Sequence, residues 1–179
     1  MNLKNTLRLG AFIAAFAFIV APISAYAQAS LAVVDVQNLL SQSNAAKDIQ
    51  KQVKSRRDKL QAEFSKYEKE LRDNEKKIIA ERANMSPEEF ASKRQSFEKN
   101  IIEKQKIVQG KKLDLEEGVI GATSTVRGEI AKIVASIADE KGYDIVLTRQ
   151  SVVIVAKEAD ITADVMARLN KALPKLKLK

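Results

Sequence analysis

The chain has 179 residues and a formal net charge of +8, and it contains neither histidine nor cysteine. These absences exclude disulfide bonds and remove the commonest general base, the thiol nucleophile and the standard zinc ligands, so we expect neither an enzyme nor a cofactor. Aromatic residues make up 5% of the chain and charged residues 30%, a balance that favours narrow helix seams with solvated faces over a large globular core.

The first 27 residues have the pattern of a secretory signal peptide. Lys4 and Arg8 precede an apolar run over residues 11–20, and Ala25-Tyr26-Ala27 presents small residues ahead of a cleavage position at Gln28. The apolar run is shorter than the roughly 20 residues that a membrane span requires. We therefore expect a soluble, basic, exported protein that attracts acidic partners such as anionic lipid, lipopolysaccharide or acidic polypeptides, whereas this location argues against nucleic acid.

Next in the chain come a short strand and a long helix. The β-branched run from Leu31 to Val36 predicts a buried strand. From about Asn44, apolar residues recur every three, four or seven positions, which predicts a helix with one apolar face. These positions are Ile49, Val53, Leu60, Phe64, Tyr67, Leu71 and Ile78, with Arg56 and Asn74 as polar interruptions. Such a face requires a partner.

The chain is expected to reverse after Asn84-Met85. Ser86 can cap the next helix, Glu89 can complete a capping box, and Pro87 stands at the first helical position. The returning apolar stripe contains Phe90, Phe97, Ile101, Val108, Leu115, Val119, Val126, Ile130, Ile133 and Ile137. We therefore predict an antiparallel hairpin, an arm on the order of 60 Å long. A continuous heptad seam in a parallel dimer is the alternative.

Glycines are concentrated where the returning helix should reach the base of this arm. Each glycine inside a helix costs about 1 kcal/mol relative to alanine. Two interpretations are open: the small residues allow close backbone packing, or they form a hinge that lets the arm splay. The glycines are Gly110, Gly118, Gly121 and Gly128.

After Gly142, a common helix terminator, the chain predicts a β-hairpin. Its strands are Tyr143 to Thr148 and Val152 to Ala156, with the turn at Arg149-Gln150-Ser151. Three short strands form a poor independent unit and expose their edges to another copy. We therefore expect an oligomeric body whose interface contains the N-terminal strand, this hairpin and the isoleucine-rich end of the second helix.

The chain should close with a short helix and a tail. Thr162 is expected to cap the helix, and Pro174 marks its end. The tail, Lys175-Leu176-Lys177-Leu178-Lys179, is basic, and we expect it to be disordered, with a lipid-surface contact as an alternative. The residues alone thus predict a mainly α fold with a small β-body.

At this point the order of elements resembles the Skp (OmpH-like) family of periplasmic chaperones, over essentially the whole mature chain. The resemblance rests on the long arm with its proline-marked turn and on four segments: Val33-Val34-Asp35-Val36-Gln37, Arg94-Gln95-Ser96-Phe97, Tyr143-Asp144-Ile145-Val146-Leu147 and, most specifically, Asp160-Ile161-Thr162-Ala163-Asp164-Val165. It implies a homotrimer in which coiled-coil arms project from a β-barrel-like assembly body. The arms would enclose unfolded outer-membrane proteins and prevent their aggregation without ATP.

This resemblance divides the chain and suggests site residues. We expect a signal peptide (1–27), a discontinuous body (28–43 and 119–173), an arm (44–118) with its tip near 84–87, and a tail (174–179). The candidate client contacts are apolar residues whose alternative role is in the seam, and basic residues whose alternative role is on a solvated face. The apolar ones are Phe64, Tyr67, Ile79, Met85 and Phe90, and the basic ones are Lys51, Lys54, Arg56, Arg57, Lys59 and Lys66. The family's link to lipopolysaccharide suggests Lys106, Lys111 and Lys112 by position.

A structural or adaptor protein is the alternative function. In that case the hairpin tip would dock a specific envelope partner and no client would be enclosed. Such adaptors usually carry further β-rich domains, for which this chain has no room. Suppression of client aggregation discriminates between the two functions.

Overall fold

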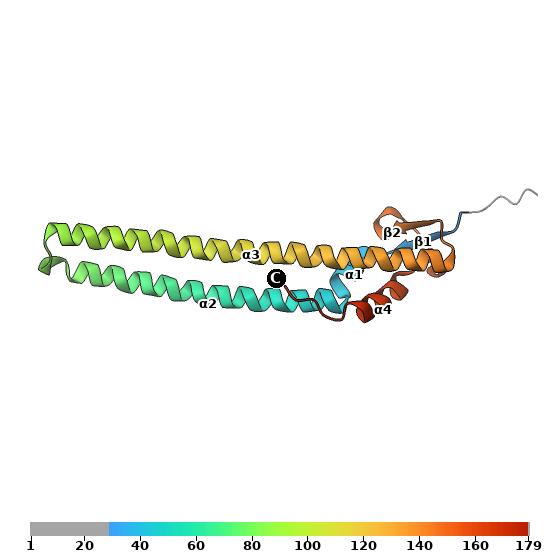
Figure 1. Cartoon of the computed structure of the whole chain (residues 1–179), viewed down its shortest axis with the longest axis horizontal. Coiled ribbons are helices and arrows are strands. Elements are labelled where there is room, and N and C mark those ends of the chain that lie inside the picture. The colour runs from blue at the N-terminus through green and yellow to red at the C-terminus, as the bar shows by residue number, and fades with distance from the viewer. Residues whose placement is uncertain (1–28, 179) are drawn as a thin grey trace, which may run out of the picture.

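The computed structural model describes residues 29–178, so the predicted signal peptide and the last residue lie outside the described residues. In Figure 1, two long helices run side by side and the smaller elements gather at one end of them. The elements, in order, are β1 (Leu31–Val34), α1 (Val36–Gln42), α2 (Asn44–Ala80), α3 (Pro87–Lys141), β2 (Ile145–Thr148) and α4 (Thr162–Ala172). We name α2 and the part of α3 beside it the arm, and the remaining elements the body.

The predicted N-terminal strand is shorter than expected because Asp35 starts a helix. The backbone N–H of Asn38 donates to Asp35 Oδ1 at 2.8 Å, which caps α1. One residue, Ser43, then separates α1 from α2, and its hydroxyl accepts from the N–H of Ala46 at 3.3 Å. Its extended backbone (φ −61°, ψ 156°) changes the direction of the chain between the two helices.

The tip of the arm is the predicted capped turn. Helix α2 ends at Ala80, and a 3-10 turn over Arg82–Asn84 leads to Ser86. The N–H of Glu89 donates to Ser86 Oγ at 3.2 Å, and the N–H of Ser86 donates to Glu89 Oε2 at 3.0 Å. The capping box is confirmed, with Pro87 as the first helical residue. Because the chain reverses here, it does not form one continuous heptad helix.

The two helices of the arm keep a single antiparallel register. With 37 residues, α2 extends about 55 Å. In each ion pair between the helices, the two residues lie equally far along the chain from Pro87. These pairs are Glu63 with Lys111 at 2.6 Å, Glu70 with Lys104 at 3.7 Å and Glu81 with Lys93 at 2.8 Å. The helices therefore fold back from the tip without a stagger.

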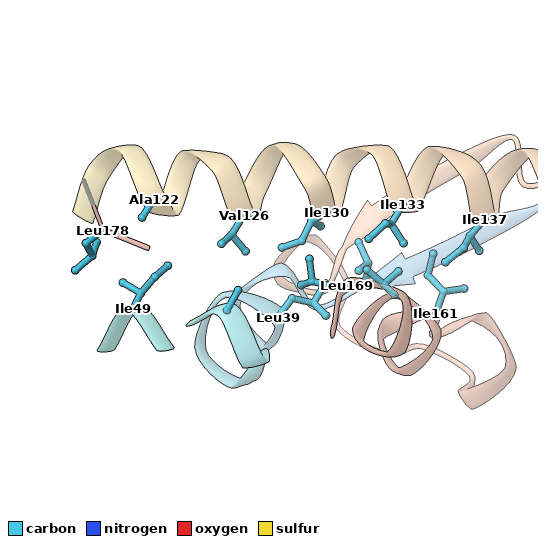
Figure 2. Close-up of a cluster of buried hydrophobic side chains, with 14 residues drawn as sticks. Leu39, Ile49, Ala122, Val126, Ile130, Ile133, Ile137, Ile161, Leu169 and Leu178 are labelled. Carbon is cyan, nitrogen blue, oxygen red and sulfur yellow. The ribbon is translucent and has the colours of Figure 1, made fainter. Parts of the chain in front are cut away.

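The core lies in the body, where the last turns of α3 cross α1 and α4 (Figure 2). Its largest fully buried side chains include Leu39, Ile137, Val165 and Leu169. Burying each of these contributes about 1.5–3 kcal/mol relative to leaving it exposed. The expectation that the isoleucine-rich end of α3 forms an oligomer interface is wrong, because these side chains are buried inside the subunit; they are Ile130, Ile133 and Ile137.

The sheet differs from the prediction. Strand β1 pairs with β2 in parallel, with Leu31 opposite Ile145 and Val34 opposite Thr148. Between residues 29 and 178 the sheet has two strands, and the predicted hairpin is wrong. A 3-10 turn follows β2 at Arg149–Ser151, and residues 152–156 form no strand. A strand needs a paired neighbour, and this part of the subunit offers none to that segment.

The start of α4 also differs from the prediction. Thr162 is the first helical residue, and Ile161 occupies the cap position. The N–H of Thr162 donates to Asp160 Oδ1 at 2.9 Å, and its hydroxyl accepts from the N–H of Asp35 at 2.8 Å. Thr162 therefore joins α4 to the end of β1, and it does so in place of the predicted capping role.

Residues 175–178 of the tail lie on the arm, so the expectation of disorder is wrong for them. Leu178 is 1% exposed and belongs to the same apolar cluster as Ile49 and Ala122, as Figure 2 shows. Figure 1 shows the C-terminus running back along the arm from α4. The alternation of lysine and leucine explains this, since an extended chain directs the leucines to one side and the lysines to the other.

Candidate functional site

The seam between α2 and α3 is open along one side near the body. Two hollows of about 530 and 650 Å³ adjoin there and share Arg57 and Val119 in their walls. We name them together the seam groove. Its apolar floor is built from the two predicted stripes and contains Ile49, Val53, Leu60, Phe64, Val108, Leu115, Val119 and Val126. The stripes thus meet along a line and do not close the seam on this side.

The rim of the seam groove is charged. Lys54, Arg57 and Lys112 lie along it with Asp58 and Glu116. Lys54 Nζ is 2.8 Å from Asp58 Oδ2, and this hydrogen bond raises the pKa of Lys54. An apolar floor below exposed cations suits a flexible segment that carries apolar and acidic side chains. The groove is open to solvent.

Among the predicted apolar contacts, Phe64 lines the seam groove and is 40% exposed. Tyr67 instead belongs to the seam, where its hydroxyl donates to Glu63 Oε1 at 2.7 Å and Lys104 Nζ lies 4.1 Å from its ring centroid. The hydrogen bond to Glu63 raises the pKa of Tyr67. These two predicted contacts therefore have different surroundings.

The other three apolar candidates lie toward the tip. Ile79 is 65% exposed. Met85 is half-buried and lines a small hollow at the tip, and Phe90 is half-buried with the guanidinium of Arg82 4.3 Å from its ring centroid. The structure therefore distributes the five apolar candidates among the groove, the seam and the tip.

The six basic candidates are separated in the same way. Lys54 and Arg57 line the seam groove, whereas Arg56 turns toward the tail and donates from Nη2 to the carbonyl of Leu178 at 2.7 Å. The remaining three, which are exposed elsewhere along α2, are Lys51, Lys59 and Lys66. The Nζ atom of Lys66 lies 3.9 Å from Glu70 Oε1.

The three lysines suggested for lipopolysaccharide do not form one cluster. Lys111 bonds to both carboxylate oxygens of Glu63, which lowers the pKa of Glu63 and raises that of Lys111. Lys106 and Lys112 are exposed, and six residues of helix place them about 120° apart around α3. Lipopolysaccharide binding at these residues stays a prediction.

The glycines of α3 lie within a continuous helix. Apart from the adjacent residues and the nearby backbone of α3 itself, a Cβ added at Gly110, Gly121 or Gly128 would meet no atom of the described chain within 4 Å. Close packing inside the described subunit therefore does not require glycine at these three positions. Thr125 Oγ1 also donates to the carbonyl of Gly121 at 2.9 Å, a contact that often bends helices. The hinge interpretation is compatible with both observations.

Sequence reasoning missed a second apolar row on α3. Ile102, Leu113 and Ile120 lie outside the predicted stripe and are more than half exposed. Their spacings of eleven and seven residues correspond to nearly whole turns, so they share one face to within about 20°. That spacing was the signal available in the sequence. The arm therefore presents apolar surface outside the seam as well.

Between residues 29 and 178, acidic side chains do not gather in groups of three that could hold a metal ion. Over the same range, none of the helices combines the length and the apolar content that crossing a membrane requires.

Comparison with known proteins agrees with this architecture. Residues 30–169 match the family described as outer membrane protein (OmpH-like). The fold is similar to that of a protein from Caulobacter crescentus CB15 assigned as an outer membrane chaperone (OmpH-like), with a TM-score of 0.77, 17% identity and coverage of 84% of this chain and 89% of that one. No curated protein sequence matches the chain. Since the family match spans most of its length, the chain belongs to the OmpH-like outer membrane protein family.

Proposed function

We propose that the protein is an ATP-independent periplasmic holdase that keeps unfolded outer-membrane β-barrel proteins from aggregating. Membership of the OmpH-like family supports a chaperone role. The observation that carries the proposal is the seam groove, whose apolar floor lies open below Arg57 and Lys112 on a long arm. An unfolded client brings apolar segments that need shielding from one another, and this surface offers such shielding.

The chemistry of the groove suits holding without nucleotide. An open groove buries only part of each apolar side chain, and about 25 cal/mol are gained per Å² of apolar area removed from water. Several weak contacts along one arm, repeated on further arms, add to a useful affinity through effective concentration. Each of these contacts breaks independently of the others. A client that begins to fold therefore leaves the groove without nucleotide hydrolysis.

The cage requires more than one copy. Strand β2 has one unpaired edge within the described chain, and Ile145 and Leu147 on it are partly exposed. After β2, Val153 and Ile154 are 94% and 85% exposed. Exposed edges and apolar side chains of this kind favour pairing with another chain. We propose that copies associate through this surface as a homotrimer, the number being the one that the family resemblance implies.

The test is dilution of a urea-unfolded outer-membrane β-barrel into buffer without nucleotide, with light scattering as the readout. The protein should keep the client soluble at low micromolar concentration. Phe64→Ser should weaken this effect because it removes an aromatic side chain from the groove floor, whereas Ile102→Ser, which removes an exposed apolar side chain outside the groove, serves as the matched control. Unchanged scattering at a stoichiometric excess of the wild-type protein would refute the holdase proposal.

A further inference from the structure

The C-terminal tail lies along α2 as an extended chain held by its main chain. The N–H of Leu176 donates to Asp48 Oδ2 at 3.2 Å, and Gln52 Nε2 donates to the carbonyl of Leu176 at 2.8 Å. The N–H of Leu178 donates to Gln52 Oε1 at 3.0 Å, and Arg56 Nη2 donates to the carbonyl of Leu178 at 2.7 Å. We name Asp48, Gln52 and Arg56 the polar ladder.

The spacing of the polar ladder fits any extended chain. Its three side chains follow one another at intervals of four residues, which rise about 6 Å along a helix, and two residues of an extended chain span about 6.6 Å. Gln52 can therefore serve two successive alternate residues with its one amide group. Because all four bonds go to backbone N–H and C=O groups, the ladder recognises an extended conformation and not a side-chain sequence.

Side chains add selectivity to this main-chain recognition. Leu178 is buried beside Ile49 and Ala122, and Leu176 is half-buried against the same cluster, while Lys175 and Lys177 are exposed. The charged residues that line the hollow next to the tail are Lys177, Arg56 of the ladder, whose guanidinium bonds the carbonyl of Leu178, and Asp114 and Glu117 of α3. The site thus accepts apolar side chains at alternate positions and favours neutral or basic side chains between them.

We infer that the polar ladder and its apolar floor form a binding site for an extended segment of another polypeptide in which apolar residues alternate with neutral or basic ones, and that the tail is the site's intramolecular occupant. This inference rests on the proposed function for the source of the segment. Alternation of apolar and polar residues is the pattern of strands in outer-membrane β-barrels. An unfolded client of that class therefore carries many segments that match the tail.

The position of the tail makes exchange feasible. It follows Pro174, beyond the last turn of α4, so the tail can leave the ladder while the helix stays in place. A competing segment can bind only while the tail is undocked. The docked tail therefore reduces the apparent affinity of the site for that segment in proportion to the fraction of time that the tail occupies it. The tail therefore occupies the site in place of a client, and only a segment with the same alternating pattern displaces it.

Binding of a labelled peptide tests this inference. The probe is the synthetic peptide Leu-Pro-Lys-Leu-Lys-Leu-Lys, the sequence of residues 173–179, followed by fluorescence anisotropy. Leu178→Asp, which undocks the tail, should bind the peptide at least about tenfold more tightly than the wild type, because the tethered competitor is removed. Lys175→Ser, which changes an exposed tail residue, should bind it like the wild type. Adding Gln52→Ala to Leu178→Asp should abolish binding.

Further peptides distinguish binding at this site from nonspecific hydrophobic binding. A peptide of the same composition with its leucines adjacent, and an alternating peptide with glutamate in place of lysine, should both bind weakly. A peptide copied from a transmembrane strand of an outer-membrane β-barrel should compete with the probe. Equal binding of the adjacent-leucine peptide, or no binding of the probe to Leu178→Asp, would overturn the inference.

Folding and the holdase proposal are checked separately. A chain that ends at Pro174 is the second undocked variant, and circular dichroism reports whether each variant keeps its helices. If both variants unfold, the tail is a structural part of the body and the inference is wrong. If client aggregation is still suppressed while the probe does not bind, only the ladder site fails; if the probe binds while aggregation is unaffected, only the holdase proposal fails.

Discussion

Glu63 and Lys111 are separated by 48 residues in the chain, yet Lys111 Nζ lies 2.6 Å from Glu63 Oε2 across the arm. Both residues are equally distant from Pro87, so their contact depends on the turn that Ser86 caps. Exposed ion pairs contribute little to stability by themselves. The pair instead fixes the alignment of the two helices. That alignment relates the turn at the tip to the residues of α2 and α3 that face each other in the seam groove.

Charge reversal at this pair should show the coupling. Glu63→Lys places a second cation against Lys111 and should lower the melting temperature by about 1–3 °C. Adding Lys111→Glu should recover most of that loss, since the pair is restored with its partners exchanged. Thermal unfolding followed by circular dichroism measures both, and Glu68→Lys, at an exposed position nearby, is the control. A double variant as unstable as the sum of the two single changes would contradict the register.

The body should lose stability in acid through Glu140. Arg168 donates to both oxygens of this carboxylate at 2.6 and 2.7 Å, and this hydrogen bonding lowers the pKa of Glu140 from its usual 4.5 to about 2. A carboxyl group whose pKa is lower in the folded protein stabilises it above the unfolded value. That contribution is complete above about pH 4.5 and is lost as the pH falls toward 2.

Glu140→Gln should therefore lower the urea midpoint at pH 7, and its difference from the wild type should disappear near pH 2. Urea titrations across this range, with Glu103→Gln at an exposed position as the matched control, measure the effect. A difference that stays constant with pH would show that the carboxylate charge is not responsible.

Replacing glycine in α3 should stabilise the chain and restrict the arm. A Cβ at Gly121 meets open space within the described chain, so Gly121→Ala should raise the free energy of unfolding by about 1 kcal/mol. Combined with Gly118→Ala, it should also narrow the range of client sizes that the protein keeps soluble. Greater stability with an unchanged size range would refute the hinge.

Assembly should depend on the exposed apolar residues after β2. Val153→Lys combined with Ile154→Lys should reduce the sedimentation-equilibrium mass to that of a monomer, because it places cations in the proposed interface. Ile79→Lys, at an exposed apolar position on the arm, should leave the mass unchanged. A wild-type protein that stays monomeric at all concentrations would exclude the cage.

Local signals in the sequence predicted both ends of α3. Ser86 and Glu89 cap α3 as expected, and Gly142 ends it with a left-handed backbone (φ 68°). These features depend on residues within a few positions of one another. By contrast, Leu31 pairs with Ile145 in the sheet, and no local pattern indicates which distant segment a strand will join. The assignment of residues 152–156 to a strand failed for the same reason.

The candidate site was predicted in part. The apolar stripes predicted the residues of the groove floor, including Phe64. They did not predict the side on which the seam stays open, because that side depends on the rotation of each helix about its axis. The stripe predicts Arg56 as a polar interruption of the seam, whereas in the structure its guanidinium donates to the tail. Its partner is a backbone carbonyl, and any residue in the chain carries one, so the sequence gives no sign of this contact.

The parallel pairing of β1 with β2 has a consequence for the order of folding. The arm closes from the tip, since contacts near Pro87 join residues close in the chain and each further turn adds only a slightly larger loop. The sheet, by contrast, joins residues 31–34 to residues 145–148. A chain that emerges from its N-terminus must wait for its last segments before β1 finds a partner. We therefore expect hydrogen-exchange labelling during refolding to protect the arm first, with the N-terminal strand unpaired until the rest is complete.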